Sequence, residues 1–75
     1  MSVASITIDW VAVGRRIREL RGFDKKQAEF AEVMGVGQSH ISAIERGTKE
    51  PGVVVLFRIA KFYGTTIEWL LTGHE

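Results

Sequence analysis

The 75-residue sequence has no cysteine, a single proline, two histidines and a net charge of only +1 at pH 7. Absent cysteine excludes disulfides and thiolate metal sites, and His40 and His74 stand too far apart to suggest a metal site by themselves. No stretch approaches the roughly 20 apolar residues of a membrane span, and the start lacks the pattern of a secretory signal. We therefore expect no cofactor, no metal, no membrane insertion and a cytoplasmic location.

Catalytic constellations are also missing. No nucleophile with a base and an orienting group, no phosphate-cradling glycine loop and no pair of catalytic carboxylates can be assembled from the sequence. We therefore expect that the protein is not an enzyme. With 45% hydrophobic residues, a chain of this length has enough apolar content for one core and too few residues for two.

The positive charge is concentrated in one segment. Residues 15–26 contain six basic and two acidic residues, whereas residues 27–75 contain four basic and six acidic ones. A local excess of this kind attracts phosphate, although an ordinary solvated helix face has the same composition. The position of the charges, rather than their total, therefore bears on the choice of partner.

Five segments have the periodicity of helices, and each is followed by a glycine in the position of a C-terminal cap. The caps are Gly22, Gly35, Gly47, Gly64 and Gly73. The second and third helices are expected at residues 27–34 and 38–46, Pro51 is expected to open the fourth, and Thr65 with Glu68 to form a capping box on the fifth. The predicted fold class is all-α, with five helices in a domain of residues 9–75. Residues 1–8 are either a flexible arm or a short strand added to a partner, and the sequence leaves both open.

The turn between the second and third helices is unusually short. Only Gly35-Val36-Gly37 separates them, as in a helix-turn-helix. At about 100° per residue, Ile41 and Ile44 point inward, and the opposite face carries an amide, two hydroxyls and a methyl group without any charge. Such groups suit the edges of bases in a major groove, although a small polar surface helix would have the same face. The residues concerned are Gln38, Ser39, Ser42 and Ala43.

The stretch from Gln27 to Gly47 resembles the lambda-repressor-like (Cro/XRE-type) helix-turn-helix family, and the resemblance extends from about Val13 to Leu71. It implies a five-helix DNA-binding domain that acts on double-stranded DNA. Gln38, Ser39 and Ala43 match groove-facing positions, and Gln27 matches a glutamine that binds a backbone phosphate. Glu45 matches an acidic residue that pairs with an arginine of the first helix, for which Arg21 is the expected partner.

Other phosphate contacts are expected around the third helix. They are Lys26 before the second helix, Arg46 at the end of the third, Thr48 and Lys49 after it, and His40. His40 either binds phosphate when protonated or, as is more common for such a histidine, is only exposed. Two residues depart from the family pattern. Lys26 and Gly37 stand where Ser or Thr caps are usual, so the second helix is capped by Asp24 or weakly capped.

The fourth segment has more apolar residues than one inward face can hold. Val54, Val55, Phe57 and Phe62 compete with the stripe of Leu56, Ile59, Ala60 and Tyr63. We predict a homodimer interface at Phe57, Phe62, Trp69 and Leu71, because a two-fold dimer reads two half-sites of a palindromic operator. The function predicted is a sequence-specific transcriptional regulator of the repressor type. The alternative is an antitoxin or antirepressor-type module that acts mainly through a protein partner.

Overall fold

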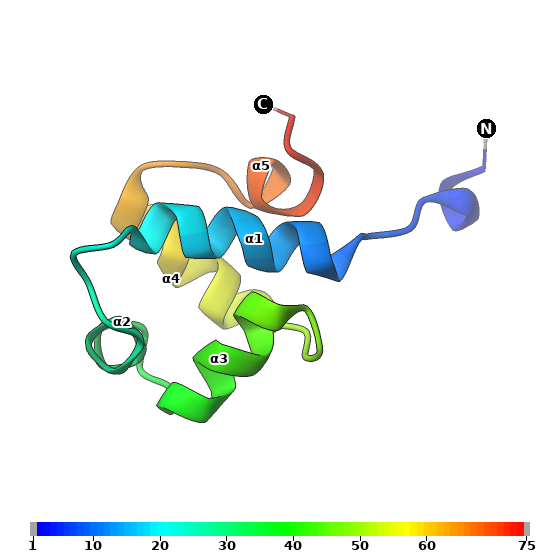
Figure 1. Ribbon diagram of the computed structural model, residues 1–75. Helices are drawn as coiled ribbons and strands as arrows, with labels where there is room; N and C mark the ends of the chain where they lie inside the picture. The colour runs from blue at the N-terminus through cyan, green and yellow to red at the C-terminus, as the bar shows by residue number, and fades with distance from the viewer. Residues whose placement is uncertain (1, 75) are drawn as a thin grey trace.

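The computed structural model describes residues 2–74. Met1, the first residue of the predicted arm, and Glu75, the last residue of the predicted domain, lie outside the described residues. The described part of the chain folds into five α-helices and one short 3-10 helix without any strand (Figure 1). The all-α class with five helices is therefore confirmed. The elements are η1 (Val3–Ser5), α1 (Trp10–Arg21), α2 (Gln27–Met34), α3 (Gln38–Arg46), α4 (Val53–Tyr63) and α5 (Ile67–Thr72).

Every predicted glycine cap is present at the end of its helix. Gly35, Gly47, Gly64 and Gly73 adopt the left-handed conformation, and Gly22 also has a positive φ. These backbone angles favour glycine because it has no Cβ. The glycines therefore set the lengths of the helices.

Two predicted helix starts were wrong by one or two residues. The cap of α5 is Thr66, whose Oγ1 accepts from the Trp69 N–H at 3.0 Å, so Thr65 and Glu68 form no capping box. The Thr65 N–H donates instead to the Ala60 carbonyl at 2.9 Å and completes the end of α4. Helix α4 begins at Val53 after Gly52, whose φ of 79° turns the chain, and Pro51 is buried ahead of that turn.

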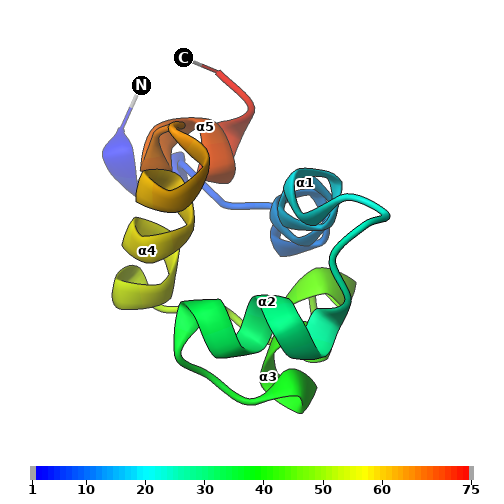
Figure 2. The ribbon, with the colours of Figure 1, turned by 90° about the vertical axis from the view of Figure 1, so that its left-hand side faces the viewer.

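The core lies between all five helices. Figure 2 shows α1 and α4 on opposite sides of the molecule, with α2 and α3 below them and α5 above. Of the four residues that compete for the inward face of α4, Val55 is buried at 7% exposure and the other three are exposed. Helix α4 packs against both α2 and α5. The buried apolar residues are Val13, Ile17, Phe30, Ala31, Met34, Ile41, Ile44, Val55, Leu56, Ile59, Ala60 and Leu70.

Two arginines tie helix ends to neighbouring helices. Arg16 of α1 donates to the Leu70 carbonyl of α5 at 2.9 Å, and Arg58 of α4 donates to the Met34 carbonyl of α2 at 2.9 Å. Each guanidinium satisfies a carbonyl group that the end of a helix leaves free, where the helix dipole also favours a cation. These bonds fix α5 on α1 and α4 on α2.

The segment before α1 extends away from the helices (Figure 1). Val3 and Ile6 are 82% and 59% exposed. The Asp9 carboxylate accepts from the Val11 and Ala12 N–H groups at 3.1 and 3.2 Å, so the helical body begins at Asp9. No helix within residues 2–74 combines the length and the apolar character needed to cross a bilayer.

Candidate nucleic-acid interface

The turn between α2 and α3 needs only one of its two glycines. Gly35 has a φ of 77°, and the Val36 N–H closes the end of α2 on the Ala31 carbonyl at 3.0 Å. Gly37, which caps α3, has an ordinary extended backbone with φ at −76°, and a Cβ built there meets nothing within 4 Å. The turn therefore depends on the left-handed Gly35, while Gly37 is replaceable.

Helix α3 has one buried and one accessible side. Ile41 and Ile44 are 0% and 1% exposed. The opposite side presents the four predicted base-reading residues: Gln38 and Ser39 are exposed, and Ser42 and Ala43 are partly buried. The amide, hydroxyl and methyl groups of this side are thus within reach of a ligand from outside.

The sequence pattern indicated that this side of α3 carries no charge, and this prediction was wrong. Arg46 is exposed and donates from Nη1 to the Ser42 hydroxyl. The two residues share a face because they are four positions apart in one helix. The accessible side of α3 therefore ends in a guanidinium.

Glu45 is the centre of a network that joins three helices. Arg21 donates to both of its carboxylate oxygens, at 2.7 and 2.9 Å, and Gln27 donates to Oε1 at 2.9 Å. The side chains of Arg21 and Glu45 are only 13% and 4% exposed, and the hydrogen bond to Glu45 raises the pKa of Arg21. Removing one partner of such a pair leaves a poorly solvated charge behind, so the network holds α3 firmly on α1 and α2.

Gln27 is thus engaged at the start of α2, where the resemblance implies a phosphate contact. One of its two amide N–H donors reaches Glu45, which leaves the other for a second acceptor. Arg21 also donates to the Lys25 carbonyl at 2.8 Å and so fixes the loop before α2. Helix α2 has no side-chain cap: Lys26 occupies the cap position with an extended backbone, and Asp24 does not replace it.

The other predicted phosphate contacts lie on the surface around α3. Lys26, Thr48 and Lys49 are exposed. The Thr48 hydroxyl donates to the Ala43 carbonyl at 3.2 Å, which orders the chain after α3. His40 is partly buried, and its Nε2 atom is buried without a hydrogen-bond partner in the described part of the chain. The ring is thus less available to a ligand than the three surface residues.

The predicted dimer residues divide into two pairs. Phe57 and Phe62 of α4 are each 52% exposed, whereas Trp69 and Leu71 of α5 are partly buried and pack against the core. Val53 and Val54 add to the exposed surface of α4, at 72% and 56%. The exposed apolar surface is therefore centred on α4 rather than α5.

Tyr63 was predicted only as a core residue, yet it lies beside the Glu45 network. Burial raises its pKa, Arg21 opposes the rise and Glu45 adds to it. Its ring is 6.1 Å from that of Phe30, and its hydroxyl has no hydrogen-bond partner within residues 2–74. No local sequence signal marks this position, because its surroundings come from α1, α2 and α3.

A family model for the helix-turn-helix matches residues 15–70, and the chain belongs to this family. The chain is 39% identical over 61 residues to the cryptic phage CTXphi transcriptional repressor RstR of Vibrio cholerae, covering 80% of this chain and 55% of that protein. It thus spans about half the length of that relative. The match is to a helix-turn-helix family rather than to an enzyme family.

Two solved structures have the same fold. The P22 c2 repressor in complex with a synthetic operator superposes with a TM-score of 0.75 at 32% identity, covering 83% of this chain and 96% of that one. The restriction-modification controller protein C.AhdI of Aeromonas hydrophila gives a TM-score of 0.73 at 28% identity, covering 84% and 97%. The resemblance to lambda-repressor-like proteins is confirmed.

Proposed function

We propose that the chain is a sequence-specific, double-stranded DNA-binding transcriptional regulator of the repressor type, which reads the major groove with α3 as a homodimer. The observation that carries the proposal is the geometry of α3. Its apolar side is buried, its polar side is accessible, and Glu45 holds the helix against Arg21 and Gln27. A rigidly mounted helix of this kind can present a fixed set of groups to base edges.

The base-reading role falls to Gln38, Ser39, Ser42 and Ala43. Gln38 is exposed at the first position of α3, and its amide can pair bidentately with adenine. The two hydroxyls can donate or accept, and the Ala43 methyl group fits beside a thymine methyl group. In the protein without DNA, the Arg46 guanidinium donates a hydrogen bond to the Ser42 hydroxyl. On binding DNA, it can exchange this hydrogen bond for one to a phosphate.

Phosphate binding falls to Gln27, Lys26, His40, Arg46, Thr48 and Lys49. Lys26 and Gln27 stand at the start of α2, and Thr48 and Lys49 follow the end of α3. The two groups of residues thus lie before and after the reading helix in the chain. Contacts of this kind position a protein on the duplex without reading its sequence.

A homodimer accounts for the exposed apolar side chains of α4. One small domain contacts one half-site only, and a two-fold dimer reads two half-sites about 34 Å apart. We assign the dimer surface to Phe57 and Phe62, extended by the exposed edges of Trp69 and Leu71. We further propose that residues 1–8 form an arm attached to a DNA-binding domain of residues 9–75.

A second candidate function follows from a hollow between α2 and α4. It has a volume of about 460 Å³ and is lined by Val33, Met34, Phe57, Arg58, Lys61 and Phe62. An antitoxin or antirepressor-type module would use such a surface for a protein partner. In that case DNA binding would be secondary.

Selection from a pool of randomised duplexes, repeated at several salt concentrations, separates the two functions. The proposed function predicts recovery of one two-fold symmetric sequence that survives moderate salt. Weak binding that salt removes without any selected sequence would contradict it and favour the partner-binding module.

A further inference from the structure

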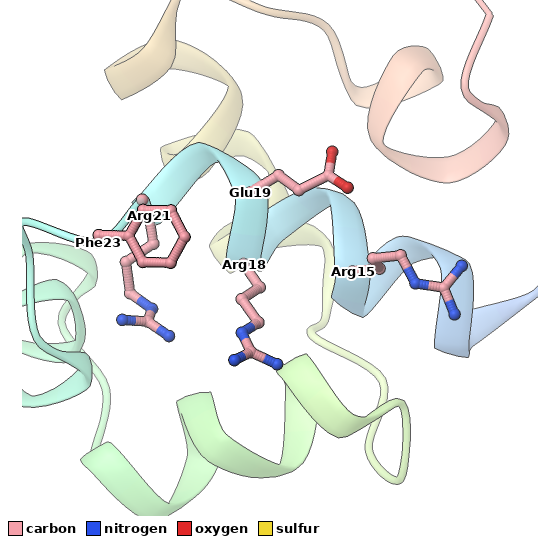
Figure 3. Close-up of a pocket in the computed structure, with 6 residues that line it drawn as sticks. Arg15, Arg18, Glu19, Arg21 and Phe23 are labelled. Atoms are coloured by element: carbon pink, nitrogen blue, oxygen red, sulfur yellow. The ribbon is translucent and has the colours of Figure 1, made fainter.

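Helix α1 carries a hollow whose lining includes two arginines outside the interface described above. It has a volume of about 610 Å³ and is lined by Arg15, Arg18, Glu19, Arg21, Gly22 and Phe23 (Figure 3). Arg21 is engaged by Glu45. Arg15 and Arg18 are exposed, and neither makes an ion pair or a side-chain hydrogen bond within residues 2–74. Two guanidinium groups are therefore available at this surface.

Arg18 lies on the flank of α1 that borders α3. Gly14 and Arg21 mark the side of α1 that faces α3, because Gly14 packs against the backbone of Ile44 and Glu45 and Arg21 pairs with Glu45. At about 100° per residue, Arg18 is displaced by about 40° from Gly14 and about 60° from Arg21 around the helix axis. Figure 3 shows the Arg18 side chain extending toward α3, as that of Arg21 does.

Arg15 stands one turn before Arg18 along α1. It is about 60° further around the axis, away from Arg21. The one carboxylate in the lining is that of Glu19, which is exposed and about 100° from Arg18 around the axis. Arg18 beside α3 and Arg15 one turn away thus form a positive surface on α1, in which Glu19 stands nearer to Arg15. We call it the α1 ledge and define it as Arg15 and Arg18.

We propose that the α1 ledge binds the phosphate backbone of duplex DNA beside the base pairs that α3 reads, with Arg18 as the principal contact. The inference rests on the proposed function, because it places α3 in the groove. The position of the ledge favours DNA over an acidic protein, because Arg18 stands one turn before Arg21, whose pair with Glu45 holds α3. A guanidinium group can bind phosphate oxygens in pairs.

The ledge explains how a protein with a net charge of +1 can hold a polyanion. Affinity for phosphate depends on local charges at the contact, and these are concentrated in residues 15–26. The contact adds affinity for any sequence and gives no preference among bases.

The first test compares the salt dependence of DNA binding in charge-matched variants. Arg18→Gln and Thr72→Asp each lower the net charge by one, but Thr72 is an exposed residue of α5 that belongs to none of the surfaces assigned above. Dissociation constants are measured for a duplex of arbitrary sequence and for the selected duplex at about 50 and about 200 mM salt. Arg18→Lys retains the charge at the ledge.

Loss of one phosphate contact lowers the slope of log affinity against log salt by about 0.9. For Arg18→Gln we expect a loss of affinity between the two salt concentrations about 3.5-fold smaller than in the wild type, on both duplexes. Thr72→Asp should behave as the wild type, and Arg18→Lys should keep most of the slope. A slope for Arg18→Gln equal to that of wild type and Thr72→Asp would overturn the proposal.

A second measurement locates the contact on the DNA. Uncharged methylphosphonate linkages are placed one at a time along the selected duplex. At the phosphate that Arg18 contacts, the uncharged linkage should weaken binding by the wild type but not by Arg18→Gln. If the two proteins lose the same affinity at every position, the proposed contact of the α1 ledge is wrong. Failure of the proposed function is separate, because a protein that selects no sequence can still show the Arg18 effect on an arbitrary duplex.

Discussion

A Cβ atom at Gly14 would come within 2.7 Å of the Glu45 carbonyl oxygen, and it would also overlap the Ile44 carbonyl. Gly14 is buried in the middle of α1, where glycine is otherwise unfavourable. Its absent side chain lets α1 lie backbone to backbone on α3 at Ile44 and Glu45, the residue that pairs with Arg21. The same glycine therefore determines how far α3 stands out from the body.

Gly14→Ala is expected to lower the free energy of unfolding by about 3 kcal/mol, because the added methyl group meets rigid backbone rather than a movable side chain. Urea unfolding measures the change. The control is Gly37→Ser, where a Cβ meets nothing within 4 Å and the hydroxyl can cap α3. This variant should be as stable as the wild type or more stable by a few tenths of a kcal/mol. Equal stability of Gly14→Ala and wild type would refute the close approach.

Lys26→Ser is expected to change stability and binding in opposite directions. Serine at the uncapped start of α2 can accept from a free backbone N–H, so we expect the free energy of unfolding to rise by about 1 kcal/mol. Removing the lysine charge should weaken binding to all duplexes alike. Thermal unfolding and DNA titration on the same preparation measure both. A variant that gains stability and binds DNA as before would remove Lys26 from the phosphate contacts.

Titration of Tyr63 is expected to lower the stability of the fold at alkaline pH. Burial raises the pKa of Tyr63 in the folded chain above its ordinary value of 10.0. The unfolded chain therefore loses this proton at a lower pH than the folded chain. The stability that the tyrosine proton contributes is fully present below the unfolded pKa and is lost as pH rises through the folded pKa. Tyr63→Phe should reduce the fall in stability between about pH 9 and about pH 11, measured by urea unfolding.

At neutral pH the same variant should be as stable as the wild type or more stable by up to about 1 kcal/mol, because the hydroxyl has no hydrogen-bond partner within residues 2–74. A loss of about 2 kcal/mol would indicate instead that the hydroxyl is bonded in solution.

Phe57→Asp tests the dimer surface without disturbing the core. Trp69 is less suitable, since it is partly buried against the core and a charge there would also affect folding. Phe57 is 52% exposed, so its replacement should leave the melting temperature nearly unchanged while it shifts the dimer toward monomer. Light scattering over a range of concentrations gives the mass. A wild type that stays monomeric at high concentration without DNA would count against a preformed dimer.

Local features of the fold could be predicted from the sequence, and contacts between distant segments could not. The five glycine caps were predictable because a left-handed residue at a helix end is a local requirement. The cap at Thr66 was missed because Thr65 has Glu68 three residues later, as a capping box requires, whereas Thr66 has Trp69 there. The burial of Val55 depends on how the helices pack together. The arginine bonds from Arg16 to Leu70 and from Arg58 to Met34 join residues without any shared motif.

The candidate site follows the same division. The exposure of Gln38 and Ser39 could be predicted from the period of one helix. The second role of Gln27 as a donor to Glu45, the approach of Gly14 and the available guanidinium of Arg18 depend on the packing of α1, α2 and α3. Helix periodicity gives the direction of a side chain from its own axis but not the helix that lies beside it.

In the proposed complex, α3 reads bases while the residues around it hold phosphates. The most direct measurement compares the sequence preference of the wild type, Gln38→Ala and Lys49→Ala on duplexes that carry every single base change in the selected site. We predict that Gln38→Ala loses discrimination at one base pair per half-site, worth about 1–3 kcal/mol, and that Lys49→Ala weakens binding to all duplexes equally. A Gln38→Ala protein with the discrimination of the wild type at every position would contradict the account.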